Sequence, residues 1–467
     1  MLSVLAIVIS LLLLIYLGYK GWSIVLLAPI LALLAAVLTA IVSGEGAYVL
    51  ATYTEVFMVN MANYVKSYFP FFLLGAIFGT VMDQSGSAKS IAEFVSRKLG
   101  HGKEALAVVL ACAIITYGGV SLFVAAFAIY PIGAVLFREA NIPKRFLPGC
   151  IALGAFTFTM TAIPGTPQIQ NTIPMRFFGT DVFAAPVLGI IAAVIMFGGG
   201  MMWLTRRIKH AVAKGEGYGD HPNEVLAQID SADLPSFTFA IIPVILVIVI
   251  NFILSKFVFV EAHAASYTYL ESFNATLSGV AGTWSLIVAL VIGIISVIVL
   301  NFKKFKKSVV EILKEGVGGS FLAVMNTASE VGYGNVIKTL AGYAIIANAM
   351  MALSAGNPLI GGAISTSVLA GITGSASGGM SIALASFAET FSEQAAALGI
   401  SPQVLHRVIA VASGGMDTLP HNGAVITLLA VTGMTHKESY VDIGMNTVVI
   451  PLIACVVIII LGTIGLC

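Results

Sequence analysis

GGMDTLPHNG, residues 414–423, interrupts an apolar block near the end of the chain. Its glycines and proline do not continue an α-helix, and a carboxylate such as Asp417 is costly to bury inside a membrane. Backbone that leaves helical geometry in a bilayer is tolerated only where protein or a water-lined cavity satisfies its polar groups. The stretch therefore predicts a broken transmembrane helix, at about 404–423, that lines an internal cavity.

The whole chain has the composition of a polytopic membrane protein. Of its 467 residues, 58% are hydrophobic and 10% are charged, whereas soluble domains carry about 25% charged residues. The apolar residues form blocks of about 20, long enough to cross about 30 Å of hydrocarbon. We therefore expect an all-α membrane fold. The first block, 2–17, has no basic segment before it and no cleavage site, so it is interpreted as a retained span.

The same inspection excludes several function classes. A net charge of +1 gives no reason to expect a nucleic-acid partner. The four cysteines lack CxxC spacing, no HExxH occurs, and no nucleophile–base pair stands out. We therefore expect neither a metal centre, nor a cofactor, nor an enzymatic activity, apart from Na⁺ as a coupling ion.

Basic residues predict the orientation of the chain. Lys and Arg cluster in four connections, which the positive-inside rule places in the cytoplasm, so that both termini lie on the outer side of the cytoplasmic (inner) membrane. The longest polar loop, 205–236, is interpreted as a cytoplasmic linker between two halves, 1–204 and 237–467. The four connections are 89–103, 138–145, 206–214 and 303–307.

The two halves carry similar interruptions, 256 to 260 residues apart. The charge bias makes the second half run in the opposite sense, so we expect two inverted-topology repeats, each with a re-entrant helical hairpin and a broken helix. A chance pseudo-repeat in a membrane scaffold is the alternative. The expected hairpins are at about 104–137 and 361–389, and the expected broken helices are at about 146–171 and 404–423. The matched residues are Gly118-Gly119 with Gly378-Gly379, Ser121 with Ser381, Pro143 with Pro402, and Pro164 with Pro420.

Two further stretches are amphipathic. They are expected to lie along the membrane surface, 48–65 at the outer interface and 303–314 at the inner one.

The interruptions supply the candidate substrate site. Glycine lets backbone N–H groups face a ligand, and helix N-termini carry partial positive charge. Because almost no Lys or Arg lies near the interruptions, a carboxylate would be held by N–H groups, hydroxyls and amides, which favours a small organic monoanion. The alternative for each glycine pair is close helix packing. The candidate substrate-binding residues are Thr116, Gly118, Gly119, Ser121, Thr161, Thr166, Gln168, Ser375, Ser377, Gly378, Gly379, Thr418, His421 and Asn422.

Asp417 is the main candidate for cation coupling, because an ionisable group at this depth usually marks a proton or cation site. His421, four residues further on, is placed to share its proton. Gly374 and Ser377 add carbonyl and hydroxyl oxygens suited to Na⁺. A helix cap for Asp417 and a structural hydrogen bond for His421 are the alternatives. Glu330 is interpreted as a solvated or capping group.

The run from Asp417 to Thr427, followed by GMTHKESY at 433–440, resembles the gluconate permease (GntP) family, and most closely its D-β-hydroxybutyrate permease-like branch. The resemblance covers essentially the whole chain. It implies a member of the ion transporter superfamily, with a scaffold domain and a mobile transport domain that carries both hairpins. It also implies a homodimer with elevator-type alternating access, in which 48–65 and 303–314 are the arms that join the two domains.

The sugar-acid members carry Asn-Asp-Ser-Gly where this chain has PHNG at 420–423, so the resemblance favours a smaller and less hydroxylated acid than gluconate. Proton coupling is usual in the family, and relatives in the superfamily use Na⁺. We therefore expect a secondary active transporter, an H⁺-coupled symporter of a small hydroxy-monocarboxylate such as 3-hydroxybutyrate. Its expected partners are the organic anion, the coupling cation, the lipid bilayer and a second copy of the chain.

Three alternatives remain open. They are a gluconate or other sugar-acid/proton symporter, a Na⁺-coupled organic-anion symporter, and a cation exchanger. The exchanger is the least favoured of the three, because exchangers usually show clustered intramembrane carboxylates.

Overall fold

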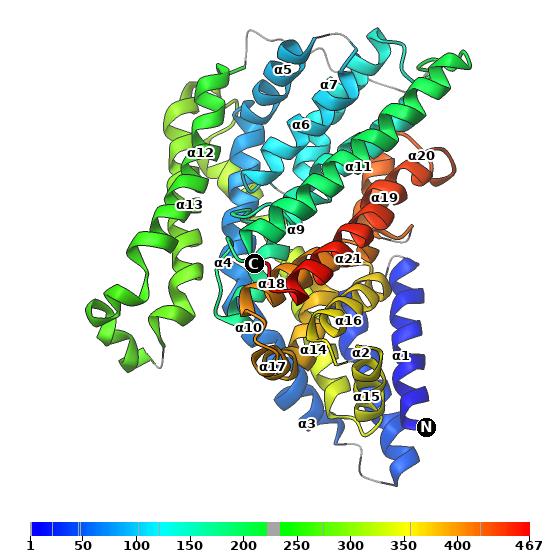
Figure 1. Ribbon diagram of the computed structural model, residues 1–467, viewed down its shortest axis with the longest axis vertical. Coiled ribbons are helices and arrows are strands. Elements are labelled where there is room, and N and C mark those ends of the chain that lie inside the picture. The colour runs from blue at the N-terminus through cyan, green and yellow to red at the C-terminus, as the bar shows by residue number, and fades with distance from the viewer. Residues whose placement is uncertain are drawn as a thin grey trace.

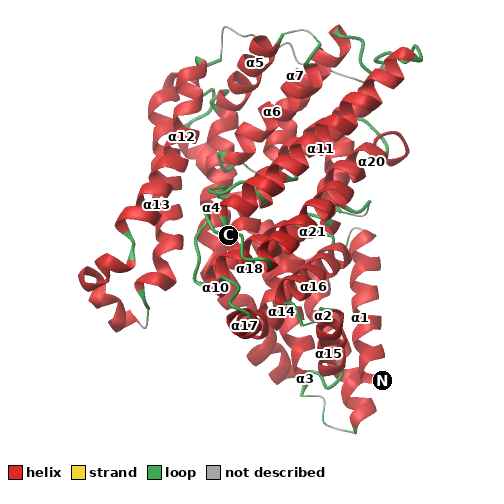
Figure 2. Ribbon diagram, viewed as in Figure 1, coloured by secondary structure: helices red, strands yellow, loops and turns green. Residues whose placement is uncertain are grey.

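The computed structural model describes residues 2–467 except 21, 45, 47, 101, 121, 222–233, 274, 355 and 421. This described part consists of helices and connecting loops, without a strand (Figure 2). Six of its helical segments are long and apolar enough to cross a membrane, so the chain is an integral membrane protein. These segments are Ile24–Val42, Val49–Gln84, Pro186–Ala213, Phe237–Val258, Leu277–Lys304 and His436–Thr463.

Figure 1 labels the helices in chain order. Short 3₁₀ and π-helical turns extend or join several of them, as at Thr52–Met58 between α3 and α4. The α-helices are α1 (Leu2–Tyr19), α2 (Ile24–Ser43), α3 (Val49–Ala51), α4 (Val59–Gln84), α5 (Ser87–Leu99), α6 (Glu104–Tyr117), α7 (Leu122–Glu139), α8 (Leu147–Ala155), α9 (Phe158–Thr161), α10 (Ile169–Phe178), α11 (Pro186–Ala213), α12 (Phe237–Ile253), α13 (Leu277–Asn301), α14 (Val309–Thr339), α15 (Tyr343–Leu353), α16 (Pro358–Thr373), α17 (Ala376–Ala397), α18 (Pro402–Ser413), α19 (Gly423–Thr432), α20 (His436–Gly444) and α21 (Ile450–Thr463).

The stretch 48–65 does not form a separate interfacial helix. It begins one continuous helical segment of 36 residues, Val49–Gln84, and Pro70 lies inside that segment without ending it. The segment packs extensively on α14 and buries Tyr64 and Tyr68. The expectation of a separate helix was therefore wrong, because this stretch continues without a break into α4.

The expected inner interfacial helix, 303–314, does not form either. Ser308 caps α14, and its hydroxyl accepts a hydrogen bond from the N–H of Glu311 at 3.2 Å. Residues 309–314 are therefore the first turns of a 31-residue helix. The role of these two stretches as arms between two domains stays a prediction. The expected linker also starts later than residue 205, because α11 continues to Ala213.

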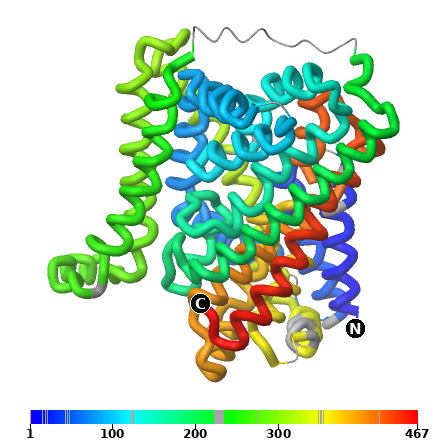
Figure 3. Tube along the Cα trace, turned by 45° about the horizontal axis from the view of Figure 1, so that its top comes forward, coloured from blue at the N-terminus to red at the C-terminus, as the bar shows by residue number. Residues whose placement is uncertain are grey.

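Two helix pairs, α6–α7 and α16–α17, lie at opposite ends of the molecule (Figures 1 and 3). Their turns include residues 118–120 and 374–375, within the glycine-containing stretches described above. The inward helices α6 and α16 have only 14 and 16 residues, which is short for a full crossing. The two turns therefore lie inside the protein.

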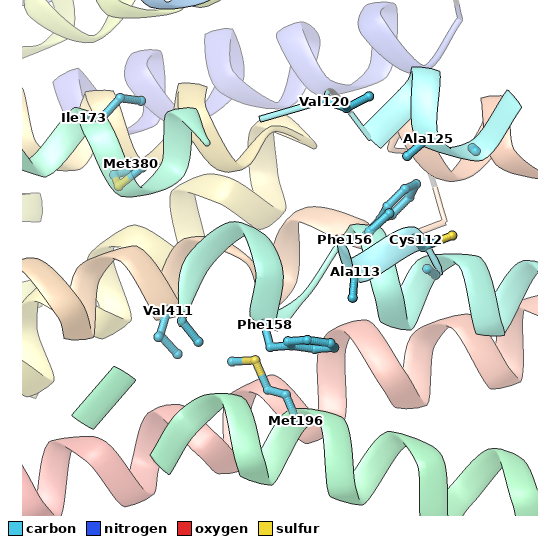
Figure 4. Close-up of a cluster of buried hydrophobic side chains, with 14 of the residues drawn as sticks. Cys112, Ala113, Val120, Ala125, Phe156, Phe158, Ile173, Met196, Met380 and Val411 are labelled. Carbon is cyan, nitrogen blue, oxygen red and sulfur yellow. The ribbon is translucent and has the colours of Figure 1, made fainter. Parts of the chain in front are cut away.

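Helical structure is also interrupted twice, between α8 and α10 and between α18 and α19. The interruptions are neighbours, because α18 packs on both α9 and α10. Phe156, Phe158, Met196 and Val411 belong to the apolar cluster around them, which joins α8, α9, α11 and α18 (Figure 4). This core holds the two non-helical segments together in the middle of the protein.

Candidate functional site

A cavity of about 740 Å³ lies where the two turns approach the two interruptions. Its volume is within the range of about 300–1,000 Å³ that is usual for small-molecule sites. Parts of α4 and α14 close it on another side. Seven of the candidate site residues line it, namely Gly119, Gln168, Gly374, Ser375, Ser377, Asp417 and Asn422.

Two side-chain amides join the turns to the interruptions in the same manner. Gln168, just before α10, donates from Nε2 to the carbonyls of Thr116 at 2.7 Å and Val120 at 3.0 Å. Asn422, just before α19, donates from Nδ2 to the carbonyl of Gly374 at 2.6 Å. Each turn therefore has carbonyls held by a side-chain amide that immediately precedes the helix after an interruption.

Asn422 has a second function as the N-cap of α19. Its Oδ1 accepts the N–H groups of Ala424 at 2.6 Å and Val425 at 3.0 Å. One amide thus caps a helix and holds the cavity wall at the same time, which Asp could not do because its carboxylate has no N–H donor.

Replacing Asn422 with Ala should therefore lower stability by about 1–2 kcal/mol and raise the KM for transport. Asn422→Asp keeps the cap but loses the bond to Gly374, so its stability should stay closer to that of the wild type while KM still rises. Thermal unfolding and uptake measure the two effects. Asn357 is the matched control, because it caps α16 away from the cavity. Equal KM values for Asn422→Ala and Asn357→Ala would contradict the assignment.

Asp417 lies in a single 3₁₀ turn, Met416–Thr418, between α18 and α19, and is 6% exposed. Its Oδ1 has no hydrogen-bond partner among the described residues. The neighbouring Thr418 does not line the cavity, since its hydroxyl donates to Thr447 at 2.7 Å and its carbonyl accepts from Tyr440 at 3.1 Å. Thr418 therefore braces the turn, while Asp417 presents an open acceptor at the cavity.

The other candidate residues lie behind the cavity wall. Two of them, Thr116 and Thr166, are buried and have hydroxyls without a partner among the described residues. Ser121 and His421 lie outside the described residues, so their roles stay predictions. The residues behind the wall are Thr116, Gly118, Thr161, Thr166, Gly378, Gly379 and Thr418.

Sequence reasoning missed Glu330 as a cavity residue. It lies in α14, is 4% exposed and lines the cavity. Its interpretation as a solvated or capping group was wrong, because it is nine residues from the end of a 31-residue helix and buried on all sides but one. A lone acid among small and apolar residues, far from either helix end, was the available signal.

The expectation that almost no Arg lies near the interruptions was wrong at one position. Arg407 in α18 is fully buried and donates to the carbonyls of Thr161 at 2.9 Å and Ala184 at 2.8 Å. It also donates to Oδ1 of Asn171 at 2.9 Å. Arg407 does not line the cavity. It fastens α18 to the carbonyls around the first interruption.

Comparison with known proteins identifies the chain. The sequence pattern of GntP family permeases matches residues 1–464. The chain belongs to this family. An uncharacterized transporter of Bacillus subtilis, YxjC, is 48% identical to this permease over 455 residues, which is 95% of each chain. An uncharacterized transporter of Haemophilus influenzae is 28% identical over 171 residues, 36% of this permease and 38% of that protein. This permease is accordingly a transporter and not an enzyme.

Two solved transporter structures share the fold of this permease. YdaH of Alcanivorax borkumensis has a TM-score of 0.57 and 16% identity, covering 90% of this permease and 89% of that chain. MtrF of Neisseria gonorrhoeae, from a class of antimetabolite efflux pumps, has a TM-score of 0.51 and 12% identity, covering 89% and 84%. At these identities the similarity concerns the fold alone.

Proposed function

We propose that this permease is a cation-coupled symporter of a small hydroxy-monocarboxylate such as 3-hydroxybutyrate, with H⁺ favoured as the coupling ion. One observation supports this above all others. The described residues that line the cavity include Asp417 and Glu330 but no Lys or Arg. The cavity therefore offers an anion no fixed positive side chain.

This charge pattern gives a physical basis for coupling. An ionised Asp417 would repel a carboxylate roughly 5 Å away by about 3 kcal/mol at an effective dielectric of 20. Substrate binding is relieved of this repulsion when a proton or cation neutralises Asp417. The anion and the cation thus favour each other's binding, and such mutual preference is the requirement for symport.

The remaining lining fits a short hydroxy acid better than a sugar acid. Phe71, Phe72, Leu122 and Ile426 supply apolar surface, which suits a hydrocarbon chain. The turn residues supply donors for one carboxylate, and Oε1 of Gln168 is left to accept a hydrogen bond from one hydroxyl, because its Nε2 already donates to the first turn. Gluconate carries a hydroxyl on every carbon after the carboxylate, so much of its polar surface would face apolar walls.

The proposed architecture is two inverted repeats, 1–204 and 237–467, in a homodimer of the cytoplasmic membrane with both termini outside. The helix pairs at opposite ends and the matching amides of Gln168 and Asn422 support the repeat. We further propose elevator-type movement, in which both pairs and both interruptions travel together against α4 and α14. The sidedness rests on the distribution of basic residues.

Uptake into proteoliposomes tests the function. Labelled 3-hydroxybutyrate, lactate and gluconate would be offered under a pH gradient or a Na⁺ gradient alone. Accumulation of the short hydroxy acids under the pH gradient is the expected result. Accumulation under the Na⁺ gradient alone would identify Na⁺, not H⁺, as the coupling ion, with Gly374 and Ser377 as its candidate ligands. Cation flux without accumulation of any acid would refute symport.

Asp417→Asn is expected to reduce gradient-driven accumulation at least tenfold while leaving exchange of internal for external substrate intact, because the amide cannot gain or lose the coupling proton. Counterflow and net uptake, measured on the same vesicles, separate the two activities. Asp220→Asn, at an exposed position outside the cavity, is the matched control. Unchanged accumulation in Asp417→Asn would reduce Asp417 to a helix-capping role.

A further inference from the structure

The carboxylate of Glu330 faces the first turn of α17. A Cβ atom added to Gly378 would overlap this carboxylate, so the two residues are in direct contact. Oε2 of Glu330 has no hydrogen-bond partner among the described residues. The N–H of Gly378 is already bonded to the hydroxyl of Ser375 at 3.0 Å. The carboxylate of Glu330 therefore points at the N-terminus of α17, but this helix end does not neutralise its charge.

Several hydroxyl groups surround this contact. The hydroxyls of Thr327 and Ser377 lie 3.4 Å apart across the α14–α17 interface. Tyr64 of α4 lies beside Thr327 and Ser381, and neither Tyr64 Oη nor Ser381 Oγ has a hydrogen-bond partner within the described residues. Buried polar atoms without partners cost about 1–3 kcal/mol each. Such a group of atoms calls for an occupant that accepts oxygen ligands.

Among the described residues around Glu330, no positive side chain supplies the missing charge. The titratable groups that face Glu330 are Tyr64, with the tilted ring of Tyr68 beside it on α4, and Asp417 across the cavity. The first turns of α17 carry none. A carboxylate in these surroundings is stable only when a proton or a cation neutralises it.

We propose that Glu330, with the hydroxyls of Thr327 and Ser377, is a second site for the coupling cation, H⁺ or Na⁺. This second site rests on the proposed function and extends that function. The site joins α14 to α17, so its occupation favours the arrangement in which the two helices are packed together. With Asp417 as the first site, two cations accompany one monoanion. Each cycle then moves one net positive charge into the cell.

Membrane potential tests this charge. Proteoliposomes loaded with K⁺ would receive valinomycin to make the interior negative, without a pH or Na⁺ gradient. For one net charge per cycle, a potential of about 100 mV supports up to about 50-fold accumulation of 3-hydroxybutyrate. Repeating the assay with Na⁺ replaced by choline identifies the ion, and potential-driven uptake supports the second site in either medium.

Glu330→Gln is expected to remove the response to potential while uptake driven by a pH gradient persists through Asp417. Glu389→Gln is the matched control, since Glu389 is an exposed acid on α17, the helix that Glu330 faces. Wild-type uptake driven by the pH gradient but indifferent to potential would overturn the second site and leave symport standing. A potential response retained in Glu330→Gln would also overturn it. Absence of acid uptake under every gradient would overturn the proposed function and this inference with it.

Discussion

Replacing Arg407 with Met is expected to destabilise the permease by about 3–5 kcal/mol and to prevent recovery of folded protein. Methionine fills much of the space but donates no hydrogen bond, which leaves the carbonyls of Thr161 and Ala184 and the amide oxygen of Asn171 without their donor. Backbone carbonyls cannot be exchanged for apolar groups, so the usual gain from replacing a buried charge by a hydrocarbon does not apply. Yield of monodisperse protein and thermal unfolding in detergent measure the effect.

Two further variants sharpen this test. Arg407→Lys keeps the charge but lacks the planar fork, so it should fall between the wild type and the methionine variant. Arg97→Met removes an arginine that is 73% exposed on α5 and should unfold like the wild type. A methionine variant as stable as the wild type would show that the carbonyls find other donors.

Replacing Gly379 with Ala is expected to lower stability by about 3 kcal/mol and uptake at least tenfold. The added Cβ would overlap the backbone of Ala370, so α16 and α17 must separate. Backbone cannot yield as a flexible side chain can. The separation would displace the turn that carries Ser375 and break the bond from Asn422 to Gly374.

Gly198→Ala is the matched control for this glycine. Gly198 lies inside α11, and an added Cβ would meet nothing within 4 Å. Alanine there should leave uptake unchanged and stabilise the helix by up to about 1 kcal/mol. Normal uptake and unfolding of the Gly379→Ala protein would mean that the helix pair tolerates a wider spacing.

Local features of the sequence were sufficient to predict where helices stop. The turn at 374–375 and the interruption at 414–422 both occur where glycine, proline and hydroxyl residues stand inside apolar blocks. These signals act within a few residues of one another, so they need no knowledge of the fold. The same is true of α1, whose observed bounds, Leu2–Tyr19, follow the apolar block.

Features that depend on distant partners could not be predicted in this way. The stretch 48–65 resembled a surface helix because, in the sequence alone, an apolar face that packs on α14 looks the same as an apolar face that lies on lipid. Arg407 gave no sign of burial, since its acceptors at Thr161 and Ala184 lie more than 220 residues earlier in the chain. Glu330 stands out in the sequence as a lone acid in an apolar stretch, but its contact with Gly378 exists only in the fold. Tertiary packing decided all three.

The charge of the cavity lining has a consequence for cells that hold a store of the acid. Under the proposed function, an unloaded carrier keeps a negative interior, because its described lining has two carboxylates and no basic side chain. Acid inside the cell then meets electrostatic rejection at the open site whenever the cations have left. Uncoupled leakage of accumulated substrate down its own gradient is thereby suppressed, because the anion leaves the cell only when cations leave with it.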